Sequence, residues 1–213
     1  MKNIVIVCAG AFGREVLAII EDINRVAKEK GAVPPYNLIG FIDDNPHALD
    51  GSGITVPVLG PISDWQPIGD EVYAIGAAFA ATKIKLTKML RERGCRFESL
   101  IAPWSVVSPD VKMGEGCFIT AYRICPGVTL GDFVNVNGSM LCPGAVIGSY
   151  STTTGFTVVD NAVIGERVFV GSHAVILPGV TVGDDAQVSV GSIVTEDVRP
   201  GVTVFGVPAA EIQ

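Results

Sequence analysis

The sequence predicts two parts of different fold class: an α/β domain built on a parallel sheet, and an all-β stack of short repeated coils after it. The first prediction rests on strand-like and helix-like segments that alternate over residues 1–97. The second rests on an aliphatic–glycine pair that recurs at nearly constant spacing within residues 98–213. The chain of 213 residues also has 25 glycines, 13 prolines and only 7% aromatic residues, which favours many short, tightly turned segments.

Composition and charge exclude several classes of protein. Apolar residues make up 48% of the chain and charged residues 17%, which excludes a disordered protein. No apolar run approaches the roughly 20 residues of a membrane span, and the N-terminus lacks a secretory signal. Five cysteines without an export signal indicate reduced thiols, so we expect a cytoplasmic protein. A net charge of −7 argues against nucleic-acid and anionic-membrane partners.

The first part reads as a small Rossmann-like domain over residues 1–97. Helices and strands that alternate in this way place helices on the faces of a parallel sheet. Gly31 and the following prolines end the first helix, and Gly94 ends the second. The expected elements, in order, are a strand over 4–7, a helix with Val16, Ile19, Ile20 and Ile23 on one face, strands over 38–42, 56–59 and 72–75, and a helix carrying Leu86, Met89 and Leu90.

The turn after the first strand, "CAGAFGREV", points to phosphate or nucleotide binding, because free N–H groups at a helix N-terminus suit a phosphate. Cys8 stands in place of the first glycine of the dinucleotide-binding fingerprint, whereas Gly10 and Gly13 are present. Asp43 ends the next strand, where an acidic residue commonly meets a ribose hydroxyl. It lies 30 residues after Gly13 instead of the usual ~20, so we do not expect NAD. A packing role for the glycines is the alternative interpretation.

The repeat over residues 98–213 predicts a parallel β-helix with a triangular cross-section. Further aliphatic residues lie about six positions from each anchor, so each coil carries three short strands and is stable only when stacked on its neighbours. We expect Val158 to stack on Leu141, and Thr153 to place a polar residue at an inward position. Proline–glycine corners lie at 126–128, 143–145 and 178–180. The anchors are Met113–Gly114, Leu130–Gly131, Ile147–Gly148, Ile164–Gly165 and Val182–Gly183, at spacings of 17, 17, 17 and 18.

Both parts together resemble the hexapeptide-repeat sugar acyltransferases of the sialic acid O-acetyltransferase and bacillosamine N-acetyltransferase type. The resemblance rests on "GAFGREV", "GFIDDNP", "PVLG", "LIAPWSVVSPDVKMGEG", "VGSHAVILPGVTVG" and "VFGVPA", in family order along nearly the whole chain. It implies a left-handed β-helix, a homotrimer, a nucleotide-activated or related sugar on the first domain, and acetyl-CoA along the β-helix.

The resemblance also assigns residues to the two ligands, and it implies no metal. By resemblance, the sugar-nucleotide pocket is lined by Gly10, Phe12, Gly13, Asp43, Asp44 and Gly76, and acetyl-CoA lies near Gly171, Ser172, Ala174, Pro208 and Ala209.

The departure from the family lies at the chemistry. Family members carry a His-Asp pair on the coil corner before an aliphatic–glycine anchor, where the histidine is the general base. Counted back from Ile147–Gly148, Pro143 occupies the histidine position here and Gly144 the aspartate position. Proline has no titratable group and cannot act as a base. The sequence therefore predicts little or no acetyl transfer at neutral pH.

Three residues are weak candidates for a replacement base or nucleophile. Asp160 follows Pro143 by 17 residues, so we expect it in the same position one coil further on. His173 is expected on a different face. Cys142 stacks with Cys125, at a distance that permits a disulfide, although two packed thiols are favoured in a reducing compartment. A reactive thiolate at Cys142 would need a nearby cation or base, and the local sequence offers neither.

Two functions remain open at this point. One is an acyl-CoA-dependent sugar N- or O-acyltransferase with an altered or impaired catalytic site. The other is a retired homologue that serves as a nucleotide-sugar-binding or trimeric partner protein. Residues 100–213 hold four basic and ten acidic side chains, a net charge of −6, which is unfavourable for the polyanion acetyl-CoA. Backbone N–H groups can still bind its phosphates.

Overall fold

The computed structural model describes residues 1–212 and divides the chain into two compact units, which are described separately. Unit 1 comprises Met1–Ala78 and Thr82–Pro103, and unit 2 comprises Phe79–Ala81 and the chain from Trp104 onward. Among the described residues, neither helix is long and apolar enough to cross a membrane.

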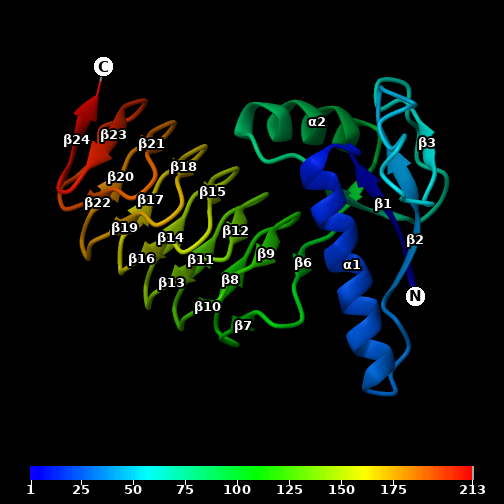
Figure 1. Ribbon diagram of the computed structural model, residues 1–213, viewed down its shortest axis with the longest axis horizontal. Coiled ribbons are helices and arrows are strands. Elements are labelled where there is room, and N and C mark those ends of the chain that lie inside the picture. The colour runs from blue at the N-terminus through cyan, green and yellow to red at the C-terminus, as the bar shows by residue number, and fades with distance from the viewer. Residues whose placement is uncertain (213) are drawn as a thin grey trace. The chain divides into compact units, whose positions relative to one another are not determined.

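Unit 1 is built on a parallel sheet with the strand order β3-β2-β1-β4-β5, of which Figure 1 labels β1, β2 and β3. Strand β1 lies at its centre, and its residues 4–7 are completely buried. This explains why the run reads as continuously apolar instead of alternating. The elements of the first 103 residues are β1 (Lys2–Val7), α1 (Ala11–Glu29), β2 (Tyr36–Ile42), β3 (Val58–Gly60), β4 (Val72–Ile75), α2 (Ala80–Glu92), β5 (Arg96–Phe97) and β6 (Leu100–Ile101).

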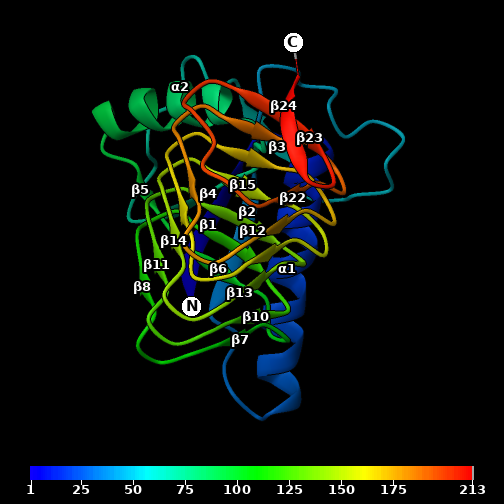
Figure 2. The same cartoon turned by 90° about the vertical axis from the view of Figure 1, so that its left-hand side faces the viewer.

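Unit 2 is a parallel β-helix whose coils are seen nearly end-on in Figure 2. We name its three faces after their first strands. The β7 face holds β7 (Val106–Val107), β10 (Arg123–Ile124), β13 (Met140–Leu141), β16 (Val158–Val159), β19 (Val175–Ile176) and β22 (Ile193–Val194). The β8 face holds β8 (Lys112–Met113), β11 (Thr129–Leu130), β14 (Val146–Ile147), β17 (Val163–Ile164) and β20 (Thr181–Val182). The β9 face holds β9 (Phe118–Thr120), β12 (Asn135–Asn137), β15 (Thr152–Thr153), β18 (Phe169–Val170), β21 (Gln187–Val188), β23 (Thr203–Gly206) and the antiparallel β24 (Ala209–Ile212).

The predicted fold class, a Rossmann-like domain followed by a parallel β-helix, is confirmed. The anchor spacing is confirmed too, because Met113, Leu130, Ile147, Ile164 and Val182 pair in succession along the β8 face.

The pairing expected for Val158 was wrong. Val159 pairs with Leu141 and is completely buried, whereas Val158 pairs with Met140. The coil that carries Thr153 has one residue more before its β16 strand than the preceding coil has before β13. It is one residue shorter at the next corner, between Val159 and Ile164, so the 17-residue anchor spacing is unchanged.

The interior of unit 2 is mainly aliphatic, and its buried hydroxyl groups differ in whether they find a hydrogen-bond partner. Thr153 points inward as expected, is completely buried, and its hydroxyl has no hydrogen-bond partner. Other buried hydroxyls lie at the corners and bond to the next coil: Ser151 Oγ donates to the Gly165 carbonyl at 2.7 Å, and Thr157 Oγ1 to the Gly171 carbonyl at 3.1 Å. A hydroxyl is therefore satisfied at the corners of this prism and not on the inward side of β15.

Candidate functional sites

Cys8 occupies the first glycine position of the fingerprint and adopts the glycine conformation. Its φ is +74°, in the left-handed region that costs a non-glycine residue about 1–2 kcal/mol. Its N–H donates to the Ile42 carbonyl at 2.9 Å, which holds the turn against β2. Burial, followed by the negative charges of Asp43 and Asp44, raises the pKa of the Cys8 thiol to about 11. Cys8 is therefore a neutral turn residue and not a nucleophile.

Two of the predicted glycines are required by close packing. A Cβ on Gly13 would lie 2.0 Å from the Cys8 carbonyl oxygen, and a Cβ on Gly76 would lie 2.6 Å from the Gly13 Cα. Both residues are buried. Gly10 differs, because it is exposed at the N-terminus of α1 and a Cβ there would meet nothing within 4 Å. Phe12, in the first turn of α1, is half-buried.

Asp43 fixes the same turn from the end of β2. Its Oδ2 accepts the Ala9 N–H at 2.8 Å, and its Oδ1 accepts the Asn45 N–H at 2.9 Å. The neighbouring Asp44 Oδ1 accepts the Ser63 N–H at 3.0 Å. Each carboxylate oxygen has further acceptor capacity, so these carboxylates can organise the loops and still accept a hydrogen bond from a ligand.

Two pockets that share Gly60 and Pro61 lie in unit 1. Sequence reasoning missed the second, because no motif marks its lining. Trp65 in that lining is held by its indole N–H, which donates to the Tyr73 hydroxyl at 2.9 Å. A pocket of about 300 Å³ is lined by Asp43, Asp44, Pro46, Val58, Gly60 and Pro61, and one of about 430 Å³ by Leu59, Gly60, Pro61, Asp64, Trp65, Gln66 and Ile68.

The corner between the β7 and β8 faces, which we call the Pro143 edge, comprises 125–127, 142–144, 160–161 and 177–179. Pro143 and Gly144 are exposed on it. Gly144 has a φ of +78°, and its N–H donates to the Pro126 carbonyl at 3.3 Å. A Cβ at this position would lie 2.7 Å from Asn161 Oδ1. The two residues form a tight turn that offers no titratable group.

Asp160 lies beside Cys142, and its expected alignment with Pro143 was wrong. Cys142 N–H donates to the Val159 carbonyl at 2.8 Å, and the Asp160 N–H donates to the Ile176 carbonyl at 3.1 Å, so the two side chains occupy equivalent positions in successive coils. The cause is the additional residue before β16, which pairs Val159 instead of Val158 with Leu141. Asp160 is half-buried, so part of the residue is in contact with solvent.

Cys125 and Cys142 stack as expected and are free thiols. Burial, followed by the negative charge of the Asp160 carboxylate and by Cys125, raises the pKa of the Cys142 thiol. A raised pKa keeps this thiol protonated, which does not favour a nucleophilic role.

His173 lies on a different edge, between the β9 and β7 faces, together with the residues expected near acetyl-CoA. The imidazole ring of His173 stacks on Phe156 with centroids 5.0 Å apart. The backbone N–H of His173 donates to the Gly155 carbonyl at 2.9 Å. Ser172 Oγ donates to Thr154 Oγ1 at 3.1 Å, and Gly171 and Ala174 are buried. The structure thus separates His173 from the Pro143 edge.

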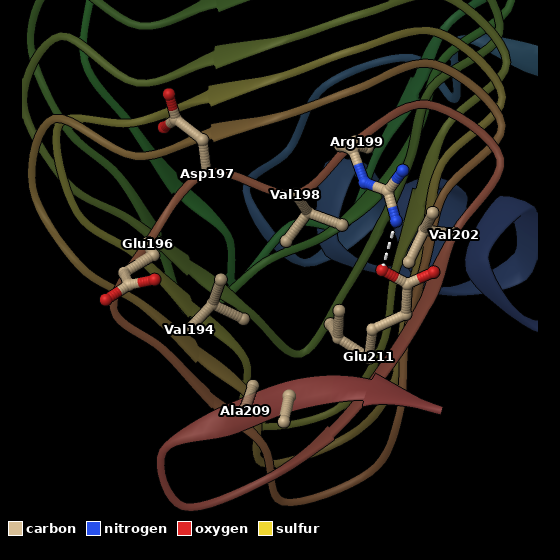
Figure 3. A pocket seen from close by; sticks show the side chains of 10 residues that line it. Val194, Glu196, Asp197, Val198, Arg199, Val202, Ala209 and Glu211 are labelled. Carbon is tan, nitrogen blue, oxygen red and sulfur yellow. Dashed lines mark hydrogen bonds and ion pairs between the residues drawn. The ribbon is translucent and has the colours of Figure 1, made fainter. Parts of the chain in front are cut away.

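A further pocket, of about 230 Å³, lies among β22, β23, β24 and the loop after β22 (Figure 3). Valines, Ala209 and charged side chains line this pocket. Ala209 belongs, with Pro208, to the segment expected near acetyl-CoA. Arg199 and Glu211 form an ion pair in this lining, so the arginine charge is offset by a carboxylate (Figure 3). Among residues 1–212, no group of three or more His, Cys, Asp or Glu side chains is arranged to hold a metal ion.

Two family models match the chain, one in each half. The PglD N-terminal domain matches residues 3–89, and the hexapeptide repeat of succinyl-transferase matches residues 162–196. The chain thus contains a segment that matches the PglD N-terminal domain and a segment that matches a hexapeptide repeat. The resemblance to hexapeptide-repeat sugar acyltransferases of this type is confirmed.

Solved structures of similar fold align over the whole chain. WeeI from Acinetobacter baumannii is 27% identical with a TM-score of 0.78, and each chain is covered completely. PerB from Caulobacter crescentus, in complex with CoA and GDP-perosamine, is 24% identical with a TM-score of 0.83, covering 100% of this chain and 98% of that one. The acetyltransferase domain of PglB from Neisseria gonorrhoeae in complex with acetyl coenzyme A is 22% identical with a TM-score of 0.81, covering 99% of both. Below 25% identity, the likeness concerns the fold alone.

Curated relatives match over a short segment only. Galactoside O-acetyltransferase of Escherichia coli is 52% identical over 46 residues, which are 22% of this chain and 23% of that protein. Chloramphenicol acetyltransferase of Agrobacterium fabrum is 48% identical over 46 residues, 22% of each chain. The segment therefore identifies a repeat and not a substrate.

Proposed function

We propose that the protein transfers an acyl group, most simply acetyl, from acyl-CoA to a nucleotide-activated or related sugar, for cell-surface glycan or secondary-metabolite biosynthesis. The observation that carries the proposal is the full-length alignment with WeeI and with PerB, which was solved with CoA and GDP-perosamine. Because function depends on the site and not on the fold, the proposal also needs pockets that suit both ligands.

The nucleotide sugar is assigned to unit 1. The pocket beside Asp43 and Asp44 lies at the carboxyl end of β2, where open parallel sheets usually bind ligands. The open N-terminus of α1 at Gly10 supplies backbone N–H groups for phosphate oxygens. The two carboxylates are suitable acceptors for ribose or base donors.

Acyl-CoA is assigned to unit 2, near Gly171, Ser172 and Ala174 and the hairpin with Pro208 and Ala209. Two of the four basic residues after position 100, Arg167 and Arg199, are paired with carboxylates. Recognition of the CoA phosphates would therefore depend mainly on backbone N–H groups.

A homotrimer belongs to the same proposal. Large apolar side chains are exposed on unit 2, including Tyr122 and Phe156 at 73% exposure each, and contact with neighbouring copies would cover them. Sedimentation at micromolar concentration should give the trimer mass, and a monomer would contradict it.

A catalytically retired, nucleotide-sugar-binding protein is the second candidate. The turn at Pro143 and Gly144 favours it, because a general base typically contributes about 10²–10⁴-fold to the rate.

Thermal shift and turnover measurements distinguish the two functions. The protein is screened with acetyl-CoA and a panel of nucleotide sugars, alone and together, since a ligand that binds the native state raises the melting temperature. Stabilisation by both ligands, with acetyl transfer, supports the enzyme. Stabilisation by sugar alone, without turnover, supports the retired binder, and no stabilisation by any nucleotide sugar would contradict both.

A further inference from the structure

The ends of three neighbouring strands in unit 1 give the nucleotide site a direction. In the sheet, β2 lies between β1 and β3, and neighbouring strands are about 4.8 Å apart. Gly10 at the start of α1 follows β1, Asp43 follows β2, and Gly60 ends β3. On such sheets a phosphate binds at the helix N-terminus, and the acidic residue after the second strand meets a ribose hydroxyl. The base of a nucleotide bound in this way extends past β2 towards Gly60.

A pocket begins where this direction leads. The pocket of about 430 Å³, which we call the Trp65 pocket, shares Gly60 and Pro61 with the pocket of Asp43 and Asp44. A Cβ on Gly60 would lie 3.9 Å from the Cε3 and Cζ3 atoms of Trp65, so the indole ring lies close to the shared border. The two pockets are therefore adjacent, and one ligand can occupy both.

The loop that forms the Trp65 pocket is fixed by hydrogen bonds to residues outside it. Arg93, in the turn after α2, donates to the carbonyls of Ile62 and Trp65 at 2.9 and 3.0 Å. The indole N–H of Trp65 donates to the Tyr73 hydroxyl, and this hydroxyl donates to the buried Glu71 at 2.5 Å. Because the backbone and the ring are already held, a ligand loses little affinity to ordering them.

The remaining lining of the Trp65 pocket combines apolar side chains with one carboxylate and one carboxamide. Leu59, Pro61 and Ile68 are apolar, whereas Asp64 and Gln66 are polar. The Asp64 carboxylate can accept two hydrogen bonds side by side, and the Gln66 carboxamide can donate one.

Guanine is the nucleobase whose edge matches these two groups. Its O6 accepts a hydrogen bond, and its N1–H and 2-amino group donate side by side. Uracil and thymine carry a carbonyl oxygen where guanine carries the amino group, and adenine has an acceptor nitrogen in place of N1–H. Each of these bases would turn a lone pair towards the carboxylate.

We propose that the Trp65 pocket binds the base of the nucleotide-activated sugar, that this base is guanine, and that Asp43 and Asp44 face the ribose. The inference rests on the proposed function. Guanine stacks on Trp65, the Asp64 carboxylate accepts N1–H and the 2-amino group, and Gln66 donates to O6. Every base can stack on an aromatic ring, so Trp65 supplies affinity and Asp64 selects guanine.

Titration calorimetry of the full-length protein with GDP, ADP and UDP tests the choice of base. We expect GDP to bind about 10- to 100-fold more tightly than the other two, because only guanine donates two hydrogen bonds to the carboxylate. Inosine diphosphate, which lacks the 2-amino group, should bind with intermediate affinity. Binding of ADP or UDP as tight as that of GDP would overturn the assignment of guanine.

Asp64→Asn tests the carboxylate through a change of specificity. Asparagine can donate to the carbonyl oxygen that xanthine carries in place of the amino group. We expect the affinity for GDP to fall about 10- to 100-fold and the affinity for xanthosine diphosphate to rise. Asp50→Asn removes the same charge from an exposed position outside both pockets and should change neither affinity. A loss of GDP binding without a gain for xanthosine diphosphate contradicts direct contact between Asp64 and the base.

Trp65 is tested by comparing a variant that keeps an aromatic ring with one that removes it. Trp65→Ala should weaken GDP binding by about 10- to 100-fold, the usual effect of removing an aromatic side chain that stacks on a base. Trp65→Phe keeps a ring without the indole N–H and should retain most of the affinity. The melting temperature of each variant without ligand separates a loss of binding from a loss of folding. Equal losses of affinity in two stably folded variants would contradict stacking.

The outcomes separate this inference from the proposed function. A wild-type protein that binds none of the nucleoside diphosphates overturns the assignment of a nucleotide sugar to unit 1, and this inference with it. Preferential binding of UDP or ADP overturns the assignment of guanine and leaves the proposed function intact. Preferential binding of GDP that neither Trp65→Ala nor Asp64→Asn weakens overturns only the assignment of the base to the Trp65 pocket.

Discussion

The turn before α1 and the Pro143 edge differ in how strongly the surrounding structure constrains their side chains. At the turn, Cys8 replaces a glycine, yet the backbone keeps the left-handed conformation and its hydrogen bond to Ile42. At the Pro143 edge, Gly144 also adopts the left-handed region, and neither Pro143 nor Gly144 carries a titratable group. Close packing fixes the backbone conformation at the turn before α1. At the Pro143 edge, the fold requires only that the chain turn between two strands.

This difference shows which motif residues carry information about chemistry. Gly13, Gly76 and Asp43 would be needed for the fold of unit 1 even without a ligand, because steric contact or backbone hydrogen bonds require them. The presence of such residues therefore supports the fold more strongly than the activity. The side chains at an exposed corner of unit 2, such as Pro143, are not held by comparable steric contacts, so residues there can change with function.

The largest effect is expected for Gly13→Ala. The new Cβ would lie 2.0 Å from the Cys8 carbonyl oxygen, and the backbone around it is buried and cannot yield easily. We expect a loss of about 3 kcal/mol or more in the free energy of unfolding, at the upper end for overpacking. Urea denaturation measures it. Gly10→Ala, where a Cβ meets nothing within 4 Å, is the matched control and should lose less than about 1 kcal/mol. Equal losses would show that packing does not explain the glycine at 13.

Asp43→Ala should have the next largest effect, on both stability and binding. It leaves the Ala9 and Asn45 N–H groups without their acceptor, which typically costs about 1–3 kcal/mol. Nucleotide-sugar affinity measured by calorimetry should fall as well. Asp50→Ala, whose side chain is exposed and pairs with exposed His47, should change stability by less than about 0.5 kcal/mol. Unchanged affinity in Asp43→Ala would move the nucleotide site elsewhere.

Gly144→Asp should destabilise unit 2 by about 1–2 kcal/mol, because a non-glycine residue must adopt a φ of +78°. The new Cβ also approaches Asn161 Oδ1 to 2.7 Å, although that side chain can move. Introducing the His-Asp pair expected from the family resemblance therefore adds strain at residue 144, and Pro143→His alone adds a base without that strain. Chemical denaturation of the single variants should show the loss at 144, and a fully stable Gly144→Asp would contradict this account of the corner.

The smallest expected effect is a gain in stability. Thr153→Val removes a buried hydroxyl without a partner and keeps the side-chain shape, so we expect unfolding to require about 1 kcal/mol more. Thr157→Val is the control, because its hydroxyl donates to Gly171 and its loss should destabilise the protein by a similar amount. If both variants changed the free energy of unfolding in the same direction, the hydrogen bond of Thr157 would not explain the difference between the two hydroxyl groups.

Sequence spacing predicted the anchors of the β-helix but not the position of every coil residue. The inward aliphatic positions are fixed by burial, so Leu130, Ile147 and Ile164 could be placed before the structure was known. Val158 and Val159 are both aliphatic, and the pattern cannot tell which of them faces inward. The misplacement of Asp160 followed from the same ambiguity, since its alignment depends on the additional residue before β16.

The sequence by itself determined the two fold classes, the coil length and the absence of a titratable side chain at Pro143, because these follow from residue identity and period. Tertiary structure alone decided which side chains meet. Phe133 and Tyr150 adopt φ values of +55° and +64° without being glycine, since each N–H donates to a carbonyl of the preceding coil at 2.8 Å and the rings stack 5.3 Å apart. Asp160 likewise takes the position equivalent to Cys142 only because the chain has one additional residue before β16. A contact between coils depends on register, and register is the sum of every insertion and deletion before it, which no local pattern records.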